Sequence, residues 1–481
     1  IKGMGLPLAG HKDNHAGLMT PQQMAQFQKS MGVREDHEWD FFEGLNTDEN
    51  TLRDFLAHVP FNAQGPRRFE APIIAVPESF ALPQAEELST QDGFGRILFD
   101  IAREDSDFAK RIVTTSPDVT VSTNLGGWVN RRGVFDLRES QDRFKEEKIP
   151  STYRWNLGPT GQHIELGIAE NNLFIQLAAL GLSHSLFGER LLPIGTLYDP
   201  FIARGLDALN YACYQNARFM VVGTPSGITL APEGGAHQSI GTPLIGMAQD
   251  GLASFEPAYV DELAIIMRWA FAYMQRHGGE ANDAPEQSWL RDETGGSVYL
   301  RLTTRPLEQP KRTLDDVRQR DIIDGAYWLR EPGPNCEIII AYQGTIAPEA
   351  IAAAGLLSED RRDVGVLAVT SADRLNAGWQ AASRARMRGL PGARSHIERL
   401  LAQVPSFATL ITVLDGHPAT LSWLGGVQGH RVTSLGVEHF GQTGTIADLY
   451  AQHNIDTQAI LRAANALVAG RPVRYLKAIN T

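Results

Sequence analysis

Short apolar runs alternate with longer amphipathic stretches from about residue 84 onward. This alternation predicts strands separated by helices, which is the pattern of βαβ units and parallel sheets. A charged connector at 305–320 divides the pattern into two blocks. The predicted strands are residues 111–115, 191–196, 218–223, 253–256 and 297–302 in the first block, and 337–341, 364–369, 409–414 and 431–434 in the second. We therefore expect an α/β protein with two parallel-sheet domains.

The residues before the first block lack this alternation. Residues 1–17 contain four glycines and no periodic pattern, which indicates a loop. Residues 18–58 have amphipathic helical spacing, whereas residues 59–83 are rich in proline and resemble a linker. The predicted division of the chain is 1–83, 84–310 and 320–481.

Composition indicates a folded protein without nucleic-acid or membrane partners. Of its 481 residues, 43% are hydrophobic and 21% are charged, which allows large cores. The net charge of −12 disfavours nucleic acid and anionic membranes, and no apolar run approaches the ~20 residues of a membrane span. Cys213 and Cys336 have no zinc or disulfide spacing, which fits a reducing cytoplasm. Because the sequence begins with Ile rather than Met, we expect its natural N-terminus upstream.

An acidic residue stands at the start of the apolar helix predicted over residues 168–180. Glu170 has apolar neighbours in GIAENNLF, although carboxylates are seldom buried without a partner. It could complement the positive end of the helix macrodipole. It could instead be a functional carboxyl group. The pattern alone leaves both interpretations open.

Three loops that follow predicted strands have an unusual composition: residues 116–128, 196–201 and 224–239. Sites in open parallel sheets form at the carboxyl ends of the strands, so these loops are candidates for one site. Their candidate residues are Asp118, Tyr198, Phe201, Glu233 and His237. The plainer interpretations are a turn residue for the aspartate, core or interface packing for the aromatics and a solvated loop histidine.

The ordered set SPDVTVSTN, GIAE, TLYDPF, PEGGAHQ and GVEHFGQTGTIADLY resembles the transketolase-like thiamine-diphosphate enzymes. Within them it is most similar to the homodimeric pyruvate dehydrogenase component that decarboxylates the 2-oxo acid. The resemblance extends over nearly the whole chain. It implies that residues 1–83 are the end of the diphosphate-binding domain, with its mobile active-site loop, and a linker. Residues 84–310 would be the pyrimidine-binding domain, and residues 320–481 the transketolase C-terminal domain.

The resemblance also implies a role for each candidate residue. Thiamine diphosphate needs a proton or hydrogen bond at N1′ of its aminopyrimidine, and Glu170 matches the family's activating glutamate. The cofactor would lie against Ile168, with Tyr198 and Phe201 lining its pyrimidine and Asp118 near its reactive face. His237 and Glu233 would face the substrate, and His15 would lie on a loop that closes over it. The implied catalytic residues are thus Glu170, His237 and His15.

The implied reaction is oxidative decarboxylation of pyruvate or a similar short 2-oxo acid, with reductive acylation of a lipoyl group on a partner acyltransferase. The implied assembly is a homodimer in which each cofactor lies between two subunits. The family binds Mg²⁺ and diphosphate through a GDG motif and a later Asn, which this sequence lacks. We therefore expect the metal ligands in a lost upstream part or a separate chain. His11 and His15 have i,i+4 spacing, but the glycines near them argue against a helix that could display a metal site.

Two alternatives remain open. One is a transketolase that moves two-carbon units between sugar phosphates, because SPDVTVSTN and Arg305 in LTTRPL are closer to that branch. The other is a scaffold subunit without cofactor, suggested by the missing diphosphate motif. A scaffold would need neither Glu170 nor His237.

Overall fold

The chain forms two compact units, Ile1–Arg67 and Arg68–Thr481, in a computed structural model. The structure describes residues 3, 5–6, 8–11, 14, 17–59, 62, 65, 68–137, 146–148, 155–277, 290–360 and 362–469. The domain boundaries predicted near residues 83 and 310 lie inside the second unit and stay predictions.

Two short helices are the regular structure described in the first unit. Helix α1 (Pro21–Ser30) begins with a capping box in which Thr20 and Gln23 exchange hydrogen bonds. Helix α2 (Glu49–Ala57) is capped by the side chain of Asp48. The helical stretch predicted over residues 18–58 is therefore two helices with turns between them.

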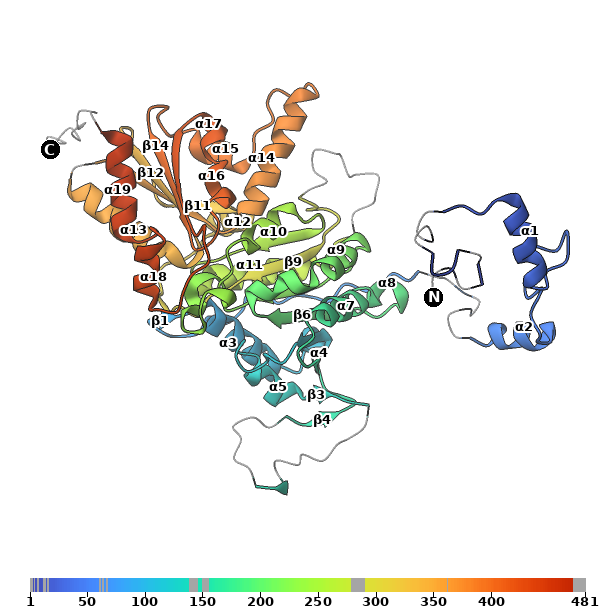
Figure 1. The fold of residues 1–481 in the computed structure, drawn as a ribbon. Coiled ribbons are helices and arrows are strands. Elements are labelled where there is room, and N and C mark those ends of the chain that lie inside the picture. The colour runs from blue at the N-terminus through green and yellow to red at the C-terminus, as the bar shows by residue number, and fades with distance from the viewer. Residues whose placement is uncertain are drawn as a thin grey trace. The chain divides into compact units, whose positions relative to one another are not determined.

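Eight described strands of the second unit form one parallel sheet (Figure 1). The strands are β2 (Ile112–Ser116), β3 (Val134–Phe135), β4 (Leu157–Gly158), β5 (His163–Glu165), β6 (Leu192–Leu197), β7 (Met220–Gly223), β8 (Leu252–Phe255) and β9 (Ser297–Arg301), in the order β4-β3-β5-β2-β6-β7-β9-β8. The five strands predicted for this block are confirmed to within two residues. The strands β3, β4 and β5 were missed because two or three residues are too few to show a pattern.

Helices cover both faces of this sheet. Helices α3 (Thr90–Arg103) and α11 (Val260–Tyr273) pack on one face, in the same core as Ile194 and Val222. Helices α7 (Glu170–Gly181) and α9 (Leu206–Tyr214) pack on the other, in a separate core. The apolar pattern of residues 168–180 thus predicted α7 with a start that is two residues early.

The second sheet has the order β11-β13-β12-β14-β15, and the parallel arrangement predicted for it is wrong at one edge. Its strands are β11 (Ala326–Arg330), β12 (Ile338–Gln343), β13 (Val364–Val369), β14 (Thr409–Leu414) and β15 (Arg431–Leu435). Strand β11 is antiparallel to β13, whereas the other pairings are parallel. Helix α12 (Asp316–Asp324) ends at Gly325 with φ of 111°, a conformation that glycine allows, and the chain reverses there directly into β11.

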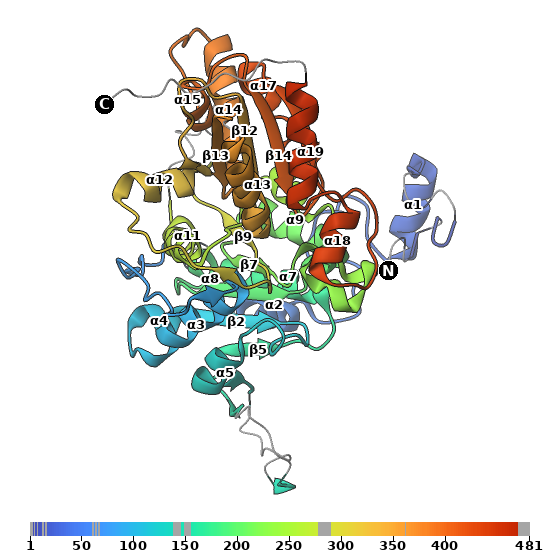
Figure 2. The ribbon, with the colours of Figure 1, turned by 90° about the vertical axis from the view of Figure 1, so that its left-hand side faces the viewer.

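Helices also cover both faces of the second sheet (Figures 1 and 2). On one face lie α13 (Ala347–Glu359) and α19 (Thr457–Val468), and on the other lie α14 (Ala372–Met387), α15 (His396–Leu401), α16 (Ala419–Ser422) and α17 (Gly425–Gln428). The first of these faces shares one continuous core with the larger sheet. The shorter elements are α4 (Asp107–Arg111), α5 (Gly126–Arg132), α8 (Ser183–Leu186), α10 (Thr242–Ala248), α18 (Ile446–Gln452), η7 (Gly344–Ile346) and the pair β1 (Glu87–Leu88) with β10 (Leu307–Glu308). None of the helices in the described part of the chain combines the length and apolar character that a bilayer crossing needs.

Candidate functional site

The three candidate loops converge at the carboxyl ends of β2, β6 and β7. The hydroxyl groups of Thr123 and Thr196 lie 2.8 Å apart and join the loop after β2 to the end of β6. The backbone N–H of Thr224 donates to the carbonyl of Leu197 at 2.8 Å and joins the loop after β7 to the same strand. The loops therefore form one edge, where a site in a parallel sheet is expected.

Glu170 begins α7 and has an ion-pair partner. The N-cap Ala169 offers no side-chain hydrogen bond, so an acidic first residue complements the free N–H groups of the first turn. The carboxylate is 10% exposed and accepts a hydrogen bond from Nη1 of Arg204 at 2.5 Å. The apolar neighbours of Glu170 in sequence had not indicated this partner. Ile168, two residues earlier, is 77% exposed.

Phe201 is the centre of an aromatic and charged group. Its ring stacks with Tyr198 at 5.9 Å between centroids, and His237 meets it edge-on at 5.4 Å. His237 Nε2 lies 3.9 Å from Oε2 of Glu233. Cζ of Arg204 lies 3.7 Å from the Phe201 centroid. The same guanidinium donates a hydrogen bond to Glu170, the first residue of α7. Five of the predicted site residues are therefore connected through the phenylalanine and the arginine.

A 3-10 helix produces this arrangement. The helix η3 (Asp199–Gly205) follows β6, and its three residues per turn bring side chains at intervals of three into line. Tyr198, Phe201 and Arg204 have this spacing. At Gly205 a Cβ atom would lie 2.3 Å from the ring of Phe174, so glycine allows η3 to approach α7 closely.

Asp118 belongs to a neighbouring group at the end of β2. Its φ is 65°, and its backbone N–H donates to Oε1 of Glu165 at 2.8 Å. The hydroxyl of Thr120 donates to the other carboxylate oxygen at 2.7 Å and contacts Nε2 of the buried His163 at 3.0 Å. Burial raises the pKa of Glu165, but the bonds from His163, Thr120 and the Asp118 backbone outweigh it and leave the pKa below its ordinary value. Asp118 itself is exposed.

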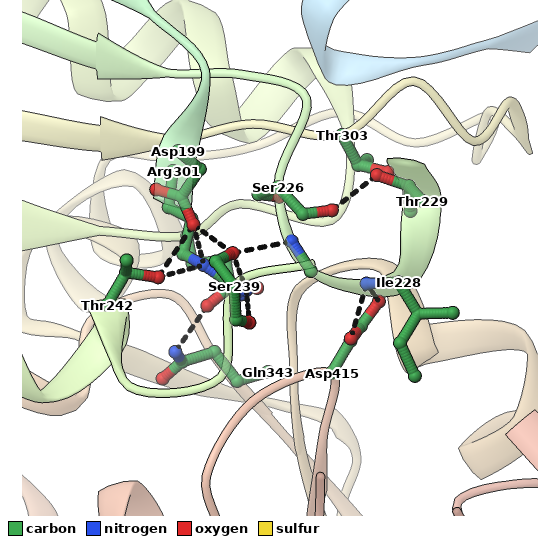
Figure 3. Close-up of polar contacts among 12 residues, drawn as sticks. Asp199, Ser226, Ile228, Thr229, Ser239, Thr242, Arg301, Thr303, Gln343 and Asp415 are labelled. Carbon is green, nitrogen blue, oxygen red and sulfur yellow. Dashed lines mark hydrogen bonds and ion pairs between the residues drawn. The ribbon is translucent and has the colours of Figure 1, made fainter. Parts of the chain in front are cut away.

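A buried polar network surrounds Asp199 (Figure 3). Asp199 lies between Tyr198 and Phe201 in sequence and is fully buried. It accepts hydrogen bonds from Thr242 at 2.6 Å and from Nε of Arg301 at 3.0 Å. The hydroxyl groups of Ser239 and Tyr299 also donate to it. At Gly223 a Cβ atom would lie 2.3 Å from Oδ1 of Asp199, so the end of β7 needs glycine to admit the carboxylate. The network thus holds the first residue of η3 in place.

Arg301 joins this network to the second sheet. Its Nη1 donates to Oε1 of Glu256 at 2.5 Å, and Gln343 at the end of β12 donates to Oε2 of the same carboxylate at 2.7 Å. Burial raises the pKa of Glu256 to about 7, against the lowering effect of Arg301 and Gln343. Asp415, which follows β14, accepts from the backbone N–H of Ile228 at 3.0 Å. The elements of the two sheets are therefore tied together through Arg301 and through Asp415.

The His237 loop also contacts the segment that follows β15, the last strand of the second sheet. Nε2 of Gln238 donates to the carbonyl of Gln442 at 3.0 Å. A Cβ atom at Gly235 would lie 2.0 Å from the carbonyl oxygen of Gly441. The motifs PEGGAHQ and EHFGQTG, about 200 residues apart, therefore pack backbone against backbone.

The structure brings most of the predicted residues to one edge, but it also adds residues that sequence reasoning missed. His15 lies outside the described residues. The missed residues are Arg204, Asp199, Arg301, Glu256 and Glu165. Arg204 could have been found from the sequence, since it continues the three-residue spacing of Tyr198 and Phe201. The buried network had none, because it assembles residues far apart in sequence.

The arrangement suits a flat heteroaromatic ring. Phe201 offers an aromatic face and Glu170 a hydrogen-bond acceptor beside it. Nδ1 of His237 is buried without a hydrogen-bond partner, as expected of a group that bonds to a ligand. An aminopyrimidine fits these features. Within the described ranges, no group of three or more His, Cys, Asp or Glu residues is placed to hold a metal ion.

Comparison with known proteins shows distant homology of the chain to the pyruvate dehydrogenase E1 component. Residues 80–279 match the family model of the pyruvate dehydrogenase E1 component middle domain. The pyruvate dehydrogenase E1 component of Mycolicibacterium smegmatis is 27% identical over 374 residues, which are 75% of this chain and 37% of that protein. That of Escherichia coli K12 is 23% identical over 398 residues, which are 81% of this chain and 42% of that protein. The chain thus spans about two-fifths of these relatives.

Solved structures share the fold at low identity. Transketolase from Leishmania mexicana has a TM-score of 0.59 and 18% identity over 84% of this chain and 49% of that chain. A structure described as "split gene transketolase, inactive beta4 tetramer" has a TM-score of 0.50 and 16% identity, over 79% of this chain and 98% of that chain. The expected α/β, transketolase-like fold is confirmed.

Proposed function

We propose that this chain, a distant homologue of the pyruvate dehydrogenase E1 component, supplies the pyrimidine side of a thiamine-diphosphate site in a 2-oxo acid dehydrogenase. The reaction is the oxidative decarboxylation of pyruvate or a similar short 2-oxo acid, with reductive acylation of a lipoyl group on a partner acyltransferase. The observation that carries the proposal is the connected group of Glu170, Phe201, Tyr198 and His237 at the carboxyl ends of parallel strands.

Each residue of the group has a separate proposed role. When bound, thiamine diphosphate supplies a nucleophilic carbon and an electron sink for decarboxylation. Glu170 holds a proton at N1′ of the aminopyrimidine, and Tyr198 and Phe201 line that ring. Exposed Ile168 supports the cofactor from the side. His237 moves a proton at the substrate, with Glu233 within 3.9 Å to orient it.

Two further assignments complete the proposed site. Asp118, exposed at the end of β2, lies near the reactive face of the cofactor. His15 lies outside the described residues, and its role at the substrate stays a prediction.

The diphosphate and Mg²⁺ are held by ligands outside this sequence, in an upstream segment or a separate chain. The full-length relatives are more than twice as long as the part that this chain matches. The split-gene transketolase chain, which this chain covers almost completely, forms a tetramer that its description calls inactive. We therefore expect activity only when the polypeptide that supplies the diphosphate site is present.

A homodimer is the proposed assembly. The outer surfaces of α7 and α9 carry exposed apolar side chains, with Ile175 at 54%, Tyr211 at 56% and Tyr214 at 84% exposure. Such an apolar surface, here called the α7–α9 face, is typical of a protein interface.

The transketolase alternative loses one of its supports. Both terminal nitrogens of Arg305 are hydrogen-bonded to Glu349, at 3.0 and 2.8 Å, and Nη1 also donates to the carbonyl of Thr345. A guanidinium engaged in this way is not available to a substrate phosphate. The scaffold alternative gives no reason for Glu170 and His237 to be joined through one aromatic ring.

The test uses the complete protein, with the segment or chain that supplies the diphosphate site. Thiamine diphosphate and Mg²⁺ are titrated calorimetrically, and pyruvate-dependent reduction of an artificial electron acceptor is measured. We expect cofactor-dependent turnover of pyruvate, and a loss of about 100-fold or more in kcat for Glu170→Gln, since general acid–base groups contribute factors of this size.

Glu189→Gln, at a carboxylate that is 66% exposed, is the matched control and should keep full activity. Unchanged activity of Glu170→Gln would refute the assigned role. Turnover of xylulose 5-phosphate without turnover of pyruvate would select a transketolase. Absence of cofactor binding by the complete protein would leave the scaffold alternative.

A further inference from the structure

Arg204 has a placement that the proposed function does not use. Its guanidinium lies over the Phe201 ring, with Cζ 3.7 Å from the centroid, and its Nη1 lies 2.5 Å from Oε1 of Glu170. A planar cation therefore stacks on the aromatic face and donates a hydrogen bond to the carboxylate. These are the two interactions that the proposed aminopyrimidine would make with the same pair.

The position of this guanidinium follows from the backbone. Arg204 is the last non-glycine residue of η3 and aligns with Phe201 at an interval of three residues. The close approach of η3 to α7 at Gly205 brings the Arg204 side chain toward Glu170. Arg204 is nevertheless 52% exposed at its side chain, whereas Glu170 is 10% exposed. The arginine can therefore leave into solvent, but the carboxylate cannot.

The covered face of Phe201 has no room for a second stacked group. At 3.7 Å the guanidinium is already in van der Waals contact with the ring. Tyr198 stacks against Phe201 and His237 meets it edge-on. A ring ligand that stacks on the covered face must displace Arg204.

We propose that Arg204 is a specificity-determining residue that occupies the ring-binding place seen in this structure and admits only ligands able to replace both of its contacts. The favoured ligand is a planar nitrogen heterocycle with an N–H donor, or a basic ring nitrogen, directed at Glu170. An apolar ring that covers Phe201 alone leaves the carboxylate without its partner and is rejected. This inference rests on the proposed function for the choice of aminopyrimidine as the ligand.

Displacement costs the ion pair and the cation–π contact. Both contacts are weak where the groups are partly exposed, so removal of the competitor is expected to tighten binding by about tenfold. Loss of an attractive contact to the ligand would change binding in the opposite direction. The sign of the change therefore separates a competitor from a ligand-binding arginine.

The experiment measures binding of 4-amino-5-hydroxymethyl-2-methylpyrimidine to the complete protein by calorimetry, without thiamine diphosphate. We expect Arg204→Ala to bind this probe about tenfold more tightly than the unmodified protein. Arg204→Ala combined with Glu170→Gln should lose the gain. Arg96→Ala, at an exposed arginine of α3, is the control and should leave the affinity unchanged.

A second readout addresses the guanidinium directly. Methylguanidinium should compete with the probe in Arg204→Ala, where the place is vacated, and should have no effect on the unmodified protein. A purely structural role for Arg204 would not produce this competition.

The outcomes are distinct from those of the functional test. Unchanged or weaker binding of the probe by Arg204→Ala, or no binding by either protein, would overturn the inference, even if the enzyme decarboxylates pyruvate. Tighter binding together with a lack of decarboxylation would keep the inference and overturn the proposed function.

Discussion

Arg301 allows the energetics of the buried network to be measured. The side chain is 1% exposed and donates to Asp199 and Glu256, whose side chains are 0% and 6% exposed. Substitution by methionine keeps much of the volume but removes the only cation among these three groups. Two buried carboxylates then lose their charge compensation. Removal of one partner from a buried ion pair typically costs about 3–5 kcal/mol, so we expect Arg301→Met to lower the free energy of unfolding by that amount at pH 7.

The matched control is the exposed pair of Arg111 and Glu189, whose side chains are 36% and 66% exposed. Arg111→Met should cost about 0–1 kcal/mol, because exposed ion pairs are solvated and screened. Both variants are unfolded in urea and followed by circular dichroism, with the slopes compared to check that the unfolded states match. Addition of Glu256→Gln to Arg301→Met should recover part of the loss, since it removes one uncompensated carboxylate. Equal losses in the two single variants would refute the reasoning that burial makes the Arg301 network costly to break.

Two further predictions concern pH and assembly. The pKa of Glu256 is raised from 4.5 to about 7 in the folded protein, so its protonated form stabilises the fold at low pH, and this contribution of roughly 3 kcal/mol is lost as pH rises from about 4.5 to 7. In urea unfolding, Glu256→Gln should therefore gain stability relative to the unmodified protein across this range, and a constant difference would contradict the assignment. Ile175→Glu or Tyr214→Glu on the α7–α9 face should reduce self-association in sedimentation velocity, whereas Met387→Glu, at a residue of α14 that is 77% exposed, should not. Equal sedimentation of all three variants and the unmodified protein would show that this face is not the interface.

The regular elements were predictable where the apolar pattern was long enough. Strands β13 and β14 match residues 364–369 and 409–414, because continuous apolar runs mark strands buried on both faces. The antiparallel edge strand β11 was missed because its direction depends on the reversal at Gly325, which the alternation of strands and helices does not contain.

The candidate site was predictable in its parts but not in its connections. Motif resemblance named Glu170, Tyr198, Phe201 and His237, and the sheet brings them to one edge. The contact from Arg204 to Glu170 was hidden, because it depends on the close approach of η3 to α7. Arg301 and Asp199 are 102 residues apart in sequence, and no local pattern relates them.

The backbone packing between the His237 loop and Gly441 has a consequence for how this protein can be divided. The second sheet contributes none of the proposed catalytic groups, yet the motif EHFGQTG that follows its last strand packs against the His237 loop and supports it. A fragment that ends before this sheet would lose that support, together with the hydrogen bond that Gln343 donates and those that Asp415 accepts. Engineered chimaeras that exchange residues 320–481 for those of a relative must therefore keep EHFGQTG matched to PEGGAHQ. These two motifs are best treated as one inherited unit when the gene is cut or recombined.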